Sequence, residues 1–514
     1  MKNVIYINCY ANPWIKVAEK LQSEYGYKPV YWVGYHEDDS VNLIPQHFSN
    51  IIYQKYYDAW KGVFSSKVAQ KAKECYIDVD FLRKFASEEL QAIKMMDRLD
   101  IDQRSFNFME RQRHFRNLLR SWMAVFELYK PNLVVAPVMP HRVYDYALFL
   151  LCQYNQIPYV FFDHTPFLGR YIVMDNLISI GEMFKKQYHQ FEGNNGKELD
   201  IQEDILNCFQ KVQADYKTAI PKYMVNQVVD HKKSSGIINL ARKFFTDIKE
   251  QGNSLFGNDG LIHNGVPCYY KNVDYTFENS KYPIIKYAKN KLKGNAYKKK
   301  LHAYYESLTS MPDESEKYVI FFLHYQPEAT TCPAVNIFVD QQLCIDTLLK
   351  NLPVDYKVYV KEHPSQFYAQ MEGHTGRRKE FYTDLSRNNR VRLISTSINS
   401  FALMNTAKAV STGTGTVGWE AIVRQKPVII FGYTWYENYK GVLRITDDES
   451  AIGLEKFITD YEYDEHSLKA YLAAVGNVTK RAYYYKANHK ALLGISEDEC
   501  IGNITNSIVS FCSK

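Results

Sequence analysis

The alternation of short apolar runs with longer helical stretches constrains the fold of this chain more than any other feature. It occurs in two blocks, one over residues 1–180 and the other from residue 316 onward. Runs such as KPVYWVGY, PYVFFDH and PVIIFG have the length and the β-branched and aromatic content of strands. Apolar strands separated by helices are typical of a parallel sheet covered on both faces. We therefore expect an α/β protein with two Rossmann-like domains that face a cleft.

The domain division follows from the same alternation, because 514 residues are too many for one ordinary core. We expect four parts: an N-terminal Rossmann-like domain over 1–180, a helical insertion or linker over 181–315, a second Rossmann-like domain over 316–490, and a C-terminal helix over 491–514 that could pack back on the N-terminal domain.

The charge and the cysteines restrict the partners and the compartment. A formal net charge of +6 suits anionic small molecules or an anionic membrane surface, but it is too weak to indicate nucleic acid. The nine cysteines are dispersed, which is typical of reduced thiols. No apolar stretch approaches the roughly 18 to 20 residues that span a bilayer. We expect a cytoplasmic protein that does not bind nucleic acid.

Residues 281–300 contain eight lysines and no acidic residue. A solvated helix face or an inter-domain linker is the simpler interpretation. The alternative is peripheral contact of Lys286–Lys300 with the cytoplasmic face of an anionic inner membrane. We favour the simpler one, because the lysines lack the periodicity of a helix that lies on a membrane.

The stretch STGTGTVGWEAIVRQKPVIIFG, residues 411–432, lies between a strand and a helix, and Gly413, Gly415 and Gly418 have G-x-G-x-x-G spacing. Such a loop can hold a phosphate with its N–H groups and the helix dipole. The hydroxyls of Ser411, Thr412, Thr414 and Thr416 add donors. A helix start capped by Ser or Thr, with glycines for close packing, is the structural alternative. A dinucleotide is disfavoured, because the next strand ends in Gly432 and Tyr433 rather than in an acidic residue.

Two further features favour a nucleotide phosphate. Glu420 lies early in the helix after the loop, where its carboxylate could accept from ribose hydroxyls or could simply complement the helix dipole. KEHP, residues 361–364, follows an apolar strand directly and therefore lies at the ligand-binding edge of an open α/β sheet. Pro364 forces a turn there, and Lys361 and His363 can reach a phosphate.

Three segments together resemble the bacterial capsule polysaccharide biosynthesis proteins, the KpsC/KpsS-like group: HYQPEATTCP (324–333), KEHP and TGTVGWEAIVRQKPVIIFG (414–432). The resemblance implies a GT-B glycosyltransferase that uses a CMP-activated ulosonic acid, chiefly Kdo, with retention of configuration and without a metal cofactor. It also implies that the His-Pro motif and the Thr/Gly loop bind the CMP phosphate, with Glu420 on the ribose.

The resemblance places the catalytic acid after an N-terminal strand, in PYVFFDHTPFLGR (158–170), where Asp163 stands at the Asp position and Arg170 near the Arg. Phe162 replaces the family's Glu, and His164 and Thr165 replace its Gly. At the end of an apolar strand, Asp163 could attack the anomeric carbon or form an Asx turn. His164 or Glu328 could transfer the proton. Glu328 could instead contact the sugar or be an exposed loop carboxylate.

Weaker candidates complete the expected site. Gln326 and Arg170 are expected on the sugar or the acceptor, and His141 and Asp145 on the acceptor side. Asp80, in the DVD segment at 78–80, is expected to be a helix N-cap rather than a metal ligand.

The sequence thus predicts transfer of a ulosonic acid, Kdo or a nonulosonic acid such as pseudaminic acid, from CMP to a capsule or other surface glycan, free or lipid-linked. Three alternatives stay open: a UDP- or GDP-hexose transferase, a CDP-alditol phosphotransferase, and a non-catalytic glycan- or nucleotide-binding subunit of a capsule assembly complex.

Overall fold

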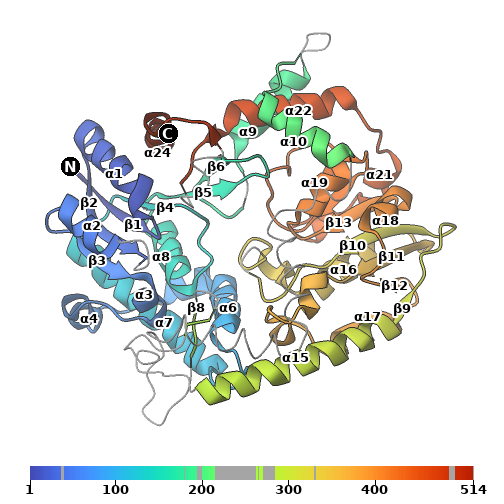
Figure 1. Ribbon diagram of the computed structural model, residues 1–514, viewed down its shortest axis with the longest axis horizontal. Coiled ribbons are helices and arrows are strands. Elements are labelled where there is room, and N and C mark those ends of the chain that lie inside the picture. Colours follow the sequence, from blue (N-terminus) through green and yellow to red (C-terminus); the bar gives the residue numbers. More distant parts are fainter. Residues whose placement is uncertain are drawn as a thin grey trace.

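The computed structural model shows two α/β halves side by side, with the N-terminal half in blue to cyan and the C-terminal half in yellow to red (Figure 1). It describes all residues of the chain except 36–39, 179, 194–198, 215–261, 264–265, 270–283, 329–330, 485–492 and 513–514.

The sheet of the N-terminal half has the strand order β16-β6-β5-β4-β1-β2-β3. Within it, β1 to β5 are parallel in the order β3-β2-β1-β4-β5, which is that of a Rossmann fold. The remaining two strands are antiparallel additions at one side. The strands are β1 (Lys2–Ile7), β2 (Tyr27–Gly34), β3 (Ile52–Lys55), β4 (Leu133–Ala136), β5 (Tyr159–His164), β6 (Arg170–Met174) and β16 (Lys480–Arg481).

Helices cover both faces of this sheet, as its apolar strands predict. The longest begins with a capping box in which Asn107 and Glu110 bond to each other's backbone N–H groups. The helices are α1 (Ala11–Tyr25), α2 (Ser40–His47), α3 (Tyr56–Lys61), α4 (Ser66–Ala72), α5 (Val79–Lys84), α6 (Ala86–Met95), the 3₁₀ turn η1 (Met96–Leu99), α7 (Phe108–Tyr129) and α8 (Val143–Tyr154). Two further helices, α9 (Glu182–Glu192) and α10 (Glu203–Ala214), follow this sheet in the chain and pack on α22 (Glu465–Val478) and α19 (Thr416–Val423).

The sheet of the C-terminal half has the order β15-β14-β13-β10-β11-β12-β9, and all its strand pairs are parallel. From β10 onward this order again is that of a Rossmann fold. The strands are β9 (Thr309–Ser310), β10 (Lys317–Phe322), β11 (Tyr356–Lys361), β12 (Val391–Ile394), β13 (Ala409–Thr412), β14 (Val428–Ile430) and β15 (Val442–Arg444). The expected fold class, two Rossmann-like domains, is therefore confirmed.

The helices of this half include one that runs below both halves in Figure 1. They are α15 (Ile284–Ser307), η3 (Asn336–Val339), α16 (Gln341–Asn351), η4 (Pro364–Phe367), η5 (Gly373–Thr375), α17 (Lys379–Arg387), α18 (Ser400–Thr406), α19 (Thr416–Val423), α20 (Asp448–Ala451), α21 (Leu454–Thr459) and α22 (Glu465–Val478). The last helix, α24 (Glu497–Cys512), belongs to the N-terminal half (Figure 1). A short hairpin, β7 (Ile262–His263) and β8 (Val266–Pro267), lies apart from both sheets.

Several elements depart from the expected boundaries. β9 lies in the expected insertion yet pairs with β12 of the C-terminal sheet. β16 lies in the expected C-terminal domain yet pairs with β6 of the N-terminal sheet. The packing of α24 on α1 is not a departure, since a C-terminal helix that could pack back on this half was expected. The N-cap of α5 is Asp78 rather than Asp80, and its carboxylate accepts from the Asp80 N–H (2.9 Å).

The lysine-rich helix α15 spans the two halves rather than presenting one free basic face. Lys286 pairs with Asp102 of the N-terminal half (2.9 Å), and Lys291 pairs with Glu372 of the C-terminal half. Buried Lys298 donates to three backbone carbonyls of residues 368–371. Three of the lysines expected at a membrane are therefore used inside the protein, which weakens that interpretation.

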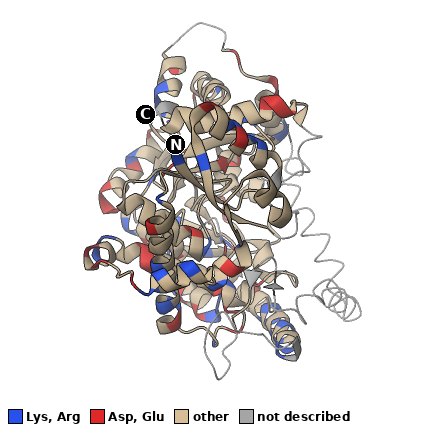
Figure 2. Ribbon diagram, turned by 90° about the vertical axis from the view of Figure 1, so that its left-hand side faces the viewer, with Lys and Arg blue, Asp and Glu red and all other residues tan. Residues whose placement is uncertain are grey.

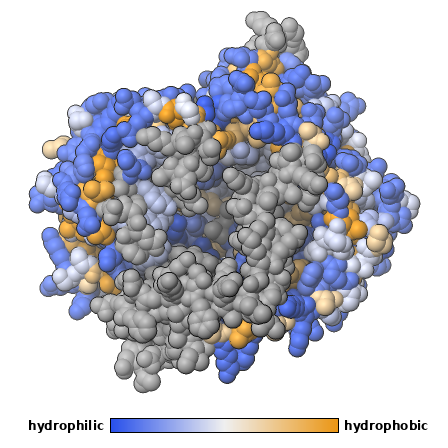
Figure 3. Space-filling view, viewed as in Figure 1, coloured by the Kyte–Doolittle hydropathy of each residue, from blue (hydrophilic) through white to orange (hydrophobic). Residues whose placement is uncertain are grey.

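Charges and apolar residues on the surface are mixed. Figure 2 shows basic and acidic residues interspersed over the N-terminal half. On the face shown in Figure 3, the described surface is largely hydrophilic and its hydrophobic residues form small separate areas. Among the helices that the structure describes, none combines the length and the apolar character that crossing a membrane requires.

Candidate functional site

The switch point of the C-terminal sheet lies between β10 and β13, where the strand order reverses. The loops at the carboxyl ends of these strands and of β11 meet at this edge. Crevices at such switch points are the usual ligand sites of open α/β sheets. The three motif segments follow these three strands, so the fold brings them together as the sequence predicted.

His324, which sequence reasoning did not single out, joins two of these loops. Its Nε2 accepts a hydrogen bond from the Thr414 backbone N–H (3.0 Å) and lies 3.1 Å from the Thr412 Oγ1. Because Nε2 is an acceptor, the proton of the neutral ring lies on Nδ1, which faces Glu328 Oε2 at 3.6 Å. The His324 ring therefore holds the glycine loop in place through these contacts with Thr412 and Thr414. A histidine directly after the first strand of the second block was the signal that could have found it.

The His-Pro segment presents a donor at the same edge. His363 is half-buried and caps η4, and its Nδ1 accepts from the Ser365 N–H (3.2 Å), which leaves the proton on Nε2. Burial, partly opposed by Glu328 and Glu362, lowers the pKa of His363. The Nε2–H of a neutral imidazole can donate a hydrogen bond to a phosphate oxygen. Pro364 is the first residue of the turn, where its missing N–H costs nothing.

Glu362, which directly precedes His363, is bonded to other side chains of the C-terminal half. Its carboxylate accepts from Arg377 Nε (3.0 Å) and from Tyr382 Oη (2.7 Å), and it is 1% exposed. Arg377 also donates to the His324 carbonyl (3.1 Å). This buried ion pair holds the β10 and β11 loops together.

Two of the expected binding residues serve the fold instead. Lys361 is 5% exposed, and its Nζ donates to the Ser400 Oγ at the start of α18 (2.9 Å). Burial lowers the pKa of Lys361 to about 8, against the effect of Glu306. Gln326 is also buried: its side chain donates to Thr331 Oγ1 (2.7 Å), and its N–H donates to Gln366 (2.9 Å). Neither side chain reaches a ligand without breaking these bonds.

The glycine loop differs from a capped helix start. The N-cap of α19 is Gly415, and no side chain caps it. Ser411 and Thr412 are buried, whereas Thr414, Gly415 and Thr416 reach the surface. The expected phosphate contacts of Ser411 and Thr412 are therefore corrected, because both hydroxyls lie inside the sheet edge. The N–H groups of residues 414–416 are what this loop offers an anion.

Close approach, rather than a dinucleotide, explains all three glycines. A Cβ on Gly415 would lie 2.9 Å from the Thr412 Oγ1. A Cβ on Gly413 would lie 3.0 Å from the His324 Nε2. One on Gly418 would lie 2.3 Å from the Tyr436 Oη, which donates to the Gly415 carbonyl (2.5 Å). Glu437, at the distance expected for a ribose-binding acid, pairs with Arg444 (2.9 Å). The spacing thus reflects packing of the loop.

Glu420 lies in the second turn of α19, later than expected, and is half-buried. Burial raises the pKa of its carboxyl to about 7, and Arg424 opposes this shift. A carboxyl group in this setting can accept from sugar hydroxyls without a strong competing partner.

Asp163 ends β5 in the N-terminal half and is half-buried. Its carboxylate accepts from the His164 N–H (3.0 Å), and burial raises its pKa to about 6. Tyr433 follows β14 of the other half. Burial raises the pKa of its hydroxyl, and the nearby Asp163 raises it further. Tyr433 also donates to the Met139 Sδ (2.9 Å). Asp163 therefore lies where the carboxyl edges of the two sheets meet.

His164 and Arg170, the other candidates near Asp163 in the sequence, do not join it at the site. His164 points to the opposite face of β5, stacks on Tyr484 and bonds to its hydroxyl through Nδ1 (2.7 Å). It therefore does not share a face with Asp163, contrary to its expected role in proton transfer. Arg170 is 2% exposed and forms a two-point ion pair with Asp204 (2.6 and 2.7 Å), so its expected sugar contact is also corrected.

Asp145 and His141 lie at the N-terminal switch point, between β1 and β4. Asp145 is buried and accepts from the Arg142 N–H (2.7 Å) at the start of α8, so its expected contact with an acceptor is corrected to a structural cap. His141 is half-buried, and its Nδ1 donates to the Met139 carbonyl (2.8 Å). Burial, then Arg142 and Arg98, hold the pKa of His141 well below its usual range.

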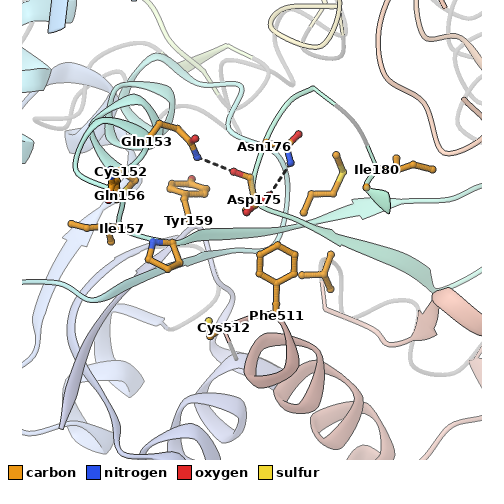
Figure 4. A pocket seen from close by; sticks show the side chains of 14 residues that line it. Cys152, Gln153, Gln156, Ile157, Tyr159, Asp175, Asn176, Ile180, Phe511 and Cys512 are labelled. Atoms are coloured by element: carbon orange, nitrogen blue, oxygen red, sulfur yellow. Dashed lines mark hydrogen bonds between the residues drawn. The ribbon is translucent and has the colours of Figure 1, made fainter. Parts of the chain in front are cut away.

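A hollow of about 540 Å³ lies apart from this region, between the C-terminal end of α8, the amino end of β5 and α24 (Figure 4). Its polar groups bond to one another: Gln153 Nε2 donates to the Asp175 carbonyl (2.9 Å), and Asn176 Nδ2 donates to the Asp175 carboxylate (2.8 Å). It lies at the opposite end of β5 from Asp163, and we assign it no function.

Two Rossmann-like sheets whose carboxyl edges meet define the GT-B class of fold. Residues 268–487, a little under half of the chain, match the family model described as "Capsule polysaccharide biosynthesis protein". The match confirms the resemblance drawn from the motifs: this part of the chain is similar to that family.

Individual relatives are distant. The chain is 29% identical over 98 residues to the capsule polysaccharide modification protein LipA of Neisseria meningitidis, which is 19% of this chain and 13% of that protein. A beta Kdo 2,7 transferase structure of Thermosulfurimonas dismutans KpsC is 16% identical, with coverage of 41% and 60% and a TM-score of 0.22. UDP-GlcNAc 2-epimerase of Methanocaldococcus jannaschii is 13% identical, with coverage of 93% and 98% and a TM-score of 0.25. At these TM-scores neither structure supports an assignment.

Proposed function

We propose that this protein is a glycosyltransferase of capsule biosynthesis that transfers a ulosonic acid from its CMP donor to a surface glycan. The observation that supports this most is the junction of the three family motifs at the switch point of the C-terminal sheet, opposite the carboxylate of Asp163. The family match of residues 268–487 supports the biosynthetic role.

The C-terminal edge would hold the CMP. The N–H groups of residues 414–416 and the dipole of α19 attract a phosphate, and the Nε2–H of His363 adds a neutral donor. Glu420 would accept from the ribose hydroxyls. The α-phosphate of CMP leaves with increased negative charge, so donors placed at this edge would stabilise the transition state.

Asp163 would act as the nucleophile. Its carboxylate would form a bond to the anomeric carbon while the bond from that carbon to the phosphate oxygen breaks, and CMP would keep the electron pair. An acceptor hydroxyl would then attack the same carbon and displace Asp163, and its proton would pass to a base. Two displacements give net retention. We assign the base to Glu328, since His164 faces away.

The proposal also includes the cellular compartment in which the reaction takes place. We place the reaction in the cytoplasm, consistent with nine cysteines that form no disulfide. Four lysines of α15, residues 289, 293, 299 and 300, are exposed and could still contact an anionic inner membrane.

A nucleotide panel tests the donor. The melting temperature of the protein is measured with CMP, UMP, GMP, ADP and NAD at equal concentration. At 100 times the dissociation constant a ligand adds about 2.7 kcal/mol of stability. We expect a shift with CMP, followed by turnover of CMP-Kdo or CMP-pseudaminic acid with a glycan acceptor. A shift with UMP or GMP alone would favour a hexose transferase, and CMP binding without turnover of any donor would favour a binding subunit.

A further inference from the structure

At the switch point of the N-terminal sheet, between β1 and β4, the described side chains carry more positive than negative charge. Arg142 and Asp145 lie after β4, and their side chains are 3.4 Å apart. Asn8, after β1, donates to the same carboxylate (3.4 Å). Arg98 enters from η1 and donates to the His141 carbonyl. Among the residues that the structure describes at this switch point, two guanidinium groups therefore lie near one carboxylate.

Arg98 has no ion pair with any carboxylate in the parts of the chain that the structure describes. Of the carboxylates close enough to affect it, Asp97 pairs with Arg111 (2.5 Å) and Lys94 (2.6 Å), and Asp145 pairs with Arg142. The guanidinium lies 5.7 Å from the centre of the Trp60 ring and is only partly exposed. Enclosed charges are normally paired, so this one points to an anionic ligand.

Aromatic rings surround the two guanidinium groups. Arg142 Nη2 bonds to the Tyr35 hydroxyl (3.4 Å). The Tyr35 ring, half-buried, stacks on Tyr10 with centroids 4.6 Å apart and planes at 6°, and it packs on Tyr56 at 4.6 Å. Rings present flat apolar faces to the C–H groups of a sugar, while an arginine fork fits a carboxylate in two-point geometry.

This switch point adjoins the place where the two halves meet. The Cys332 thiol of the C-terminal half is close enough to Arg98 for the two groups to affect each other's titration. His141 lies two residues from Met139, whose sulfur accepts from Tyr433, the residue beside Asp163. A sugar held here would therefore lie next to the proposed reacting centre.

We infer that the N-terminal switch point is a subsite for an acidic sugar, in which Arg98 binds the sugar carboxylate and the Tyr10–Tyr35 stack receives the ring. This rests on the proposed function and extends it to substrate class. The carboxylate has two possible sources, the acceptor glycan or the ulosonic acid of the donor, and both have the same chemistry.

The acceptor arm uses a matched pair of probes, the methyl glycoside of Kdo and its methyl ester. Calorimetric titration is done on the wild type and on Arg98→Gln, with and without saturating CMP. We expect the wild type to bind the acid at least tenfold more tightly than the ester. Arg98→Gln should reduce that ratio to about one, and Arg98→Lys should give an intermediate ratio. The matched control is Arg113→Gln, an exposed arginine of the same half, which should behave as the wild type.

The donor arm compares the affinities of CMP-Kdo and CMP for the same variants in an Asp163→Asn background, which prevents turnover. If Arg98→Gln removes the advantage of CMP-Kdo over CMP, the carboxylate is that of the donor. If it acts only on the glycoside, the carboxylate is that of the acceptor. The inference is overturned if neither ratio changes. CMP affinity itself should be unchanged in Arg98→Gln, and failure of the wild type to bind CMP would count against the proposed function instead, because the glycoside arm does not need CMP.

Discussion

The two switch points of this molecule have the same topology and different chemistry. At the C-terminal one, backbone N–H groups and a neutral imidazole face the crevice, and the nearby charges of Glu362 and Arg377 neutralise each other. At the N-terminal one, guanidinium groups and tyrosine rings lie near an acid, Asp163, whose pKa is raised to about 6 by burial. The first suits a phosphate that must bind and leave; the second suits a sugar that must react. The comparison shows that the fold places the sites, while the residues decide their roles.

The division of roles is tested most severely at Asp163. Asp163→Asn should lower kcat on the order of 10³-fold or more, since the variant has no nucleophile. Its Kd for CMP should stay within about twofold of the wild type, because the nucleotide lies on the other half. Steady-state kinetics and calorimetry on the same sample check both values. Unchanged turnover would remove the catalytic role from this half.

The pH dependence of kcat/KM gives a second test of Asp163 as the nucleophile. In the proposed mechanism Asp163 attacks only as a carboxylate, and burial raises its pKa to about 6. We therefore expect kcat/KM to fall about tenfold per pH unit below pH 6 and to be flat just above it. A profile with no acid limb between pH 5 and 7 would contradict a nucleophile with this pKa.

The rigidity of the C-terminal edge is tested at its buried ion pair. Arg377→Met leaves Glu362 buried without its cation, so we expect a loss of about 3 kcal/mol in the free energy of unfolding. Urea denaturation measures this. Arg378→Met is the matched control, because the neighbouring arginine is exposed and its loss should cost less than about 0.5 kcal/mol. Equal losses in the two variants would mean that this edge is not held by the pair.

His324 tests whether the glycine loop is preorganised. His324→Ala removes the acceptor of the Thr414 N–H, which frees the loop, and we expect the Kd for CMP to rise about tenfold, or 1.4 kcal/mol. His47→Ala, at an exposed histidine of the N-terminal half that pairs with Glu19, is the control. An unchanged Kd in His324→Ala would show that the loop keeps its shape without the ring.

The smallest expected effect is a gain in stability. Burial raises the pKa of Asp163 to about 6 in the folded protein, above the value of about 4 that is usual for an aspartate. The folded state thus binds this proton more tightly than the unfolded state, and its contribution to stability is present below pH 4 and lost as the pH rises through 6. Asp163→Asn removes the cost of the buried charge, so it should stabilise the protein by about 1 kcal/mol at pH 8 and not at pH 4. Thermal unfolding at the two pH values checks this, and a loss at pH 8 would contradict it.

The sequence predicted both sheets, because apolar runs such as residues 317–322 and 356–361 are read directly from local pattern. It also predicted the loops of the C-terminal site, since Pro364 restricts the backbone locally and the glycines allow close approach of neighbouring groups. It could not predict what depends on distant partners. β16 belongs to the N-terminal sheet through pairing with β6 alone. Arg170 looked like a ligand residue because its partner Asp204 lies on a separate helix.

The same limit applies to His324 and Arg98. His324 gains its role from a bond to a loop ninety residues away in the sequence, and Arg98 stands out only once the neighbouring carboxylates are seen to be paired elsewhere. Local pattern carries neither kind of information.

Calorimetric titration of CMP into Asp163→Asn and His324→Ala, with CMP-Kdo turnover measured on the same preparations, tests the central claim most directly. The division of roles predicts that Asp163→Asn binds CMP like the wild type and turns over no donor, whereas His324→Ala binds CMP about tenfold more weakly. Loss of CMP binding in Asp163→Asn together with normal binding in His324→Ala would contradict it, since the nucleotide would then lie on the N-terminal half.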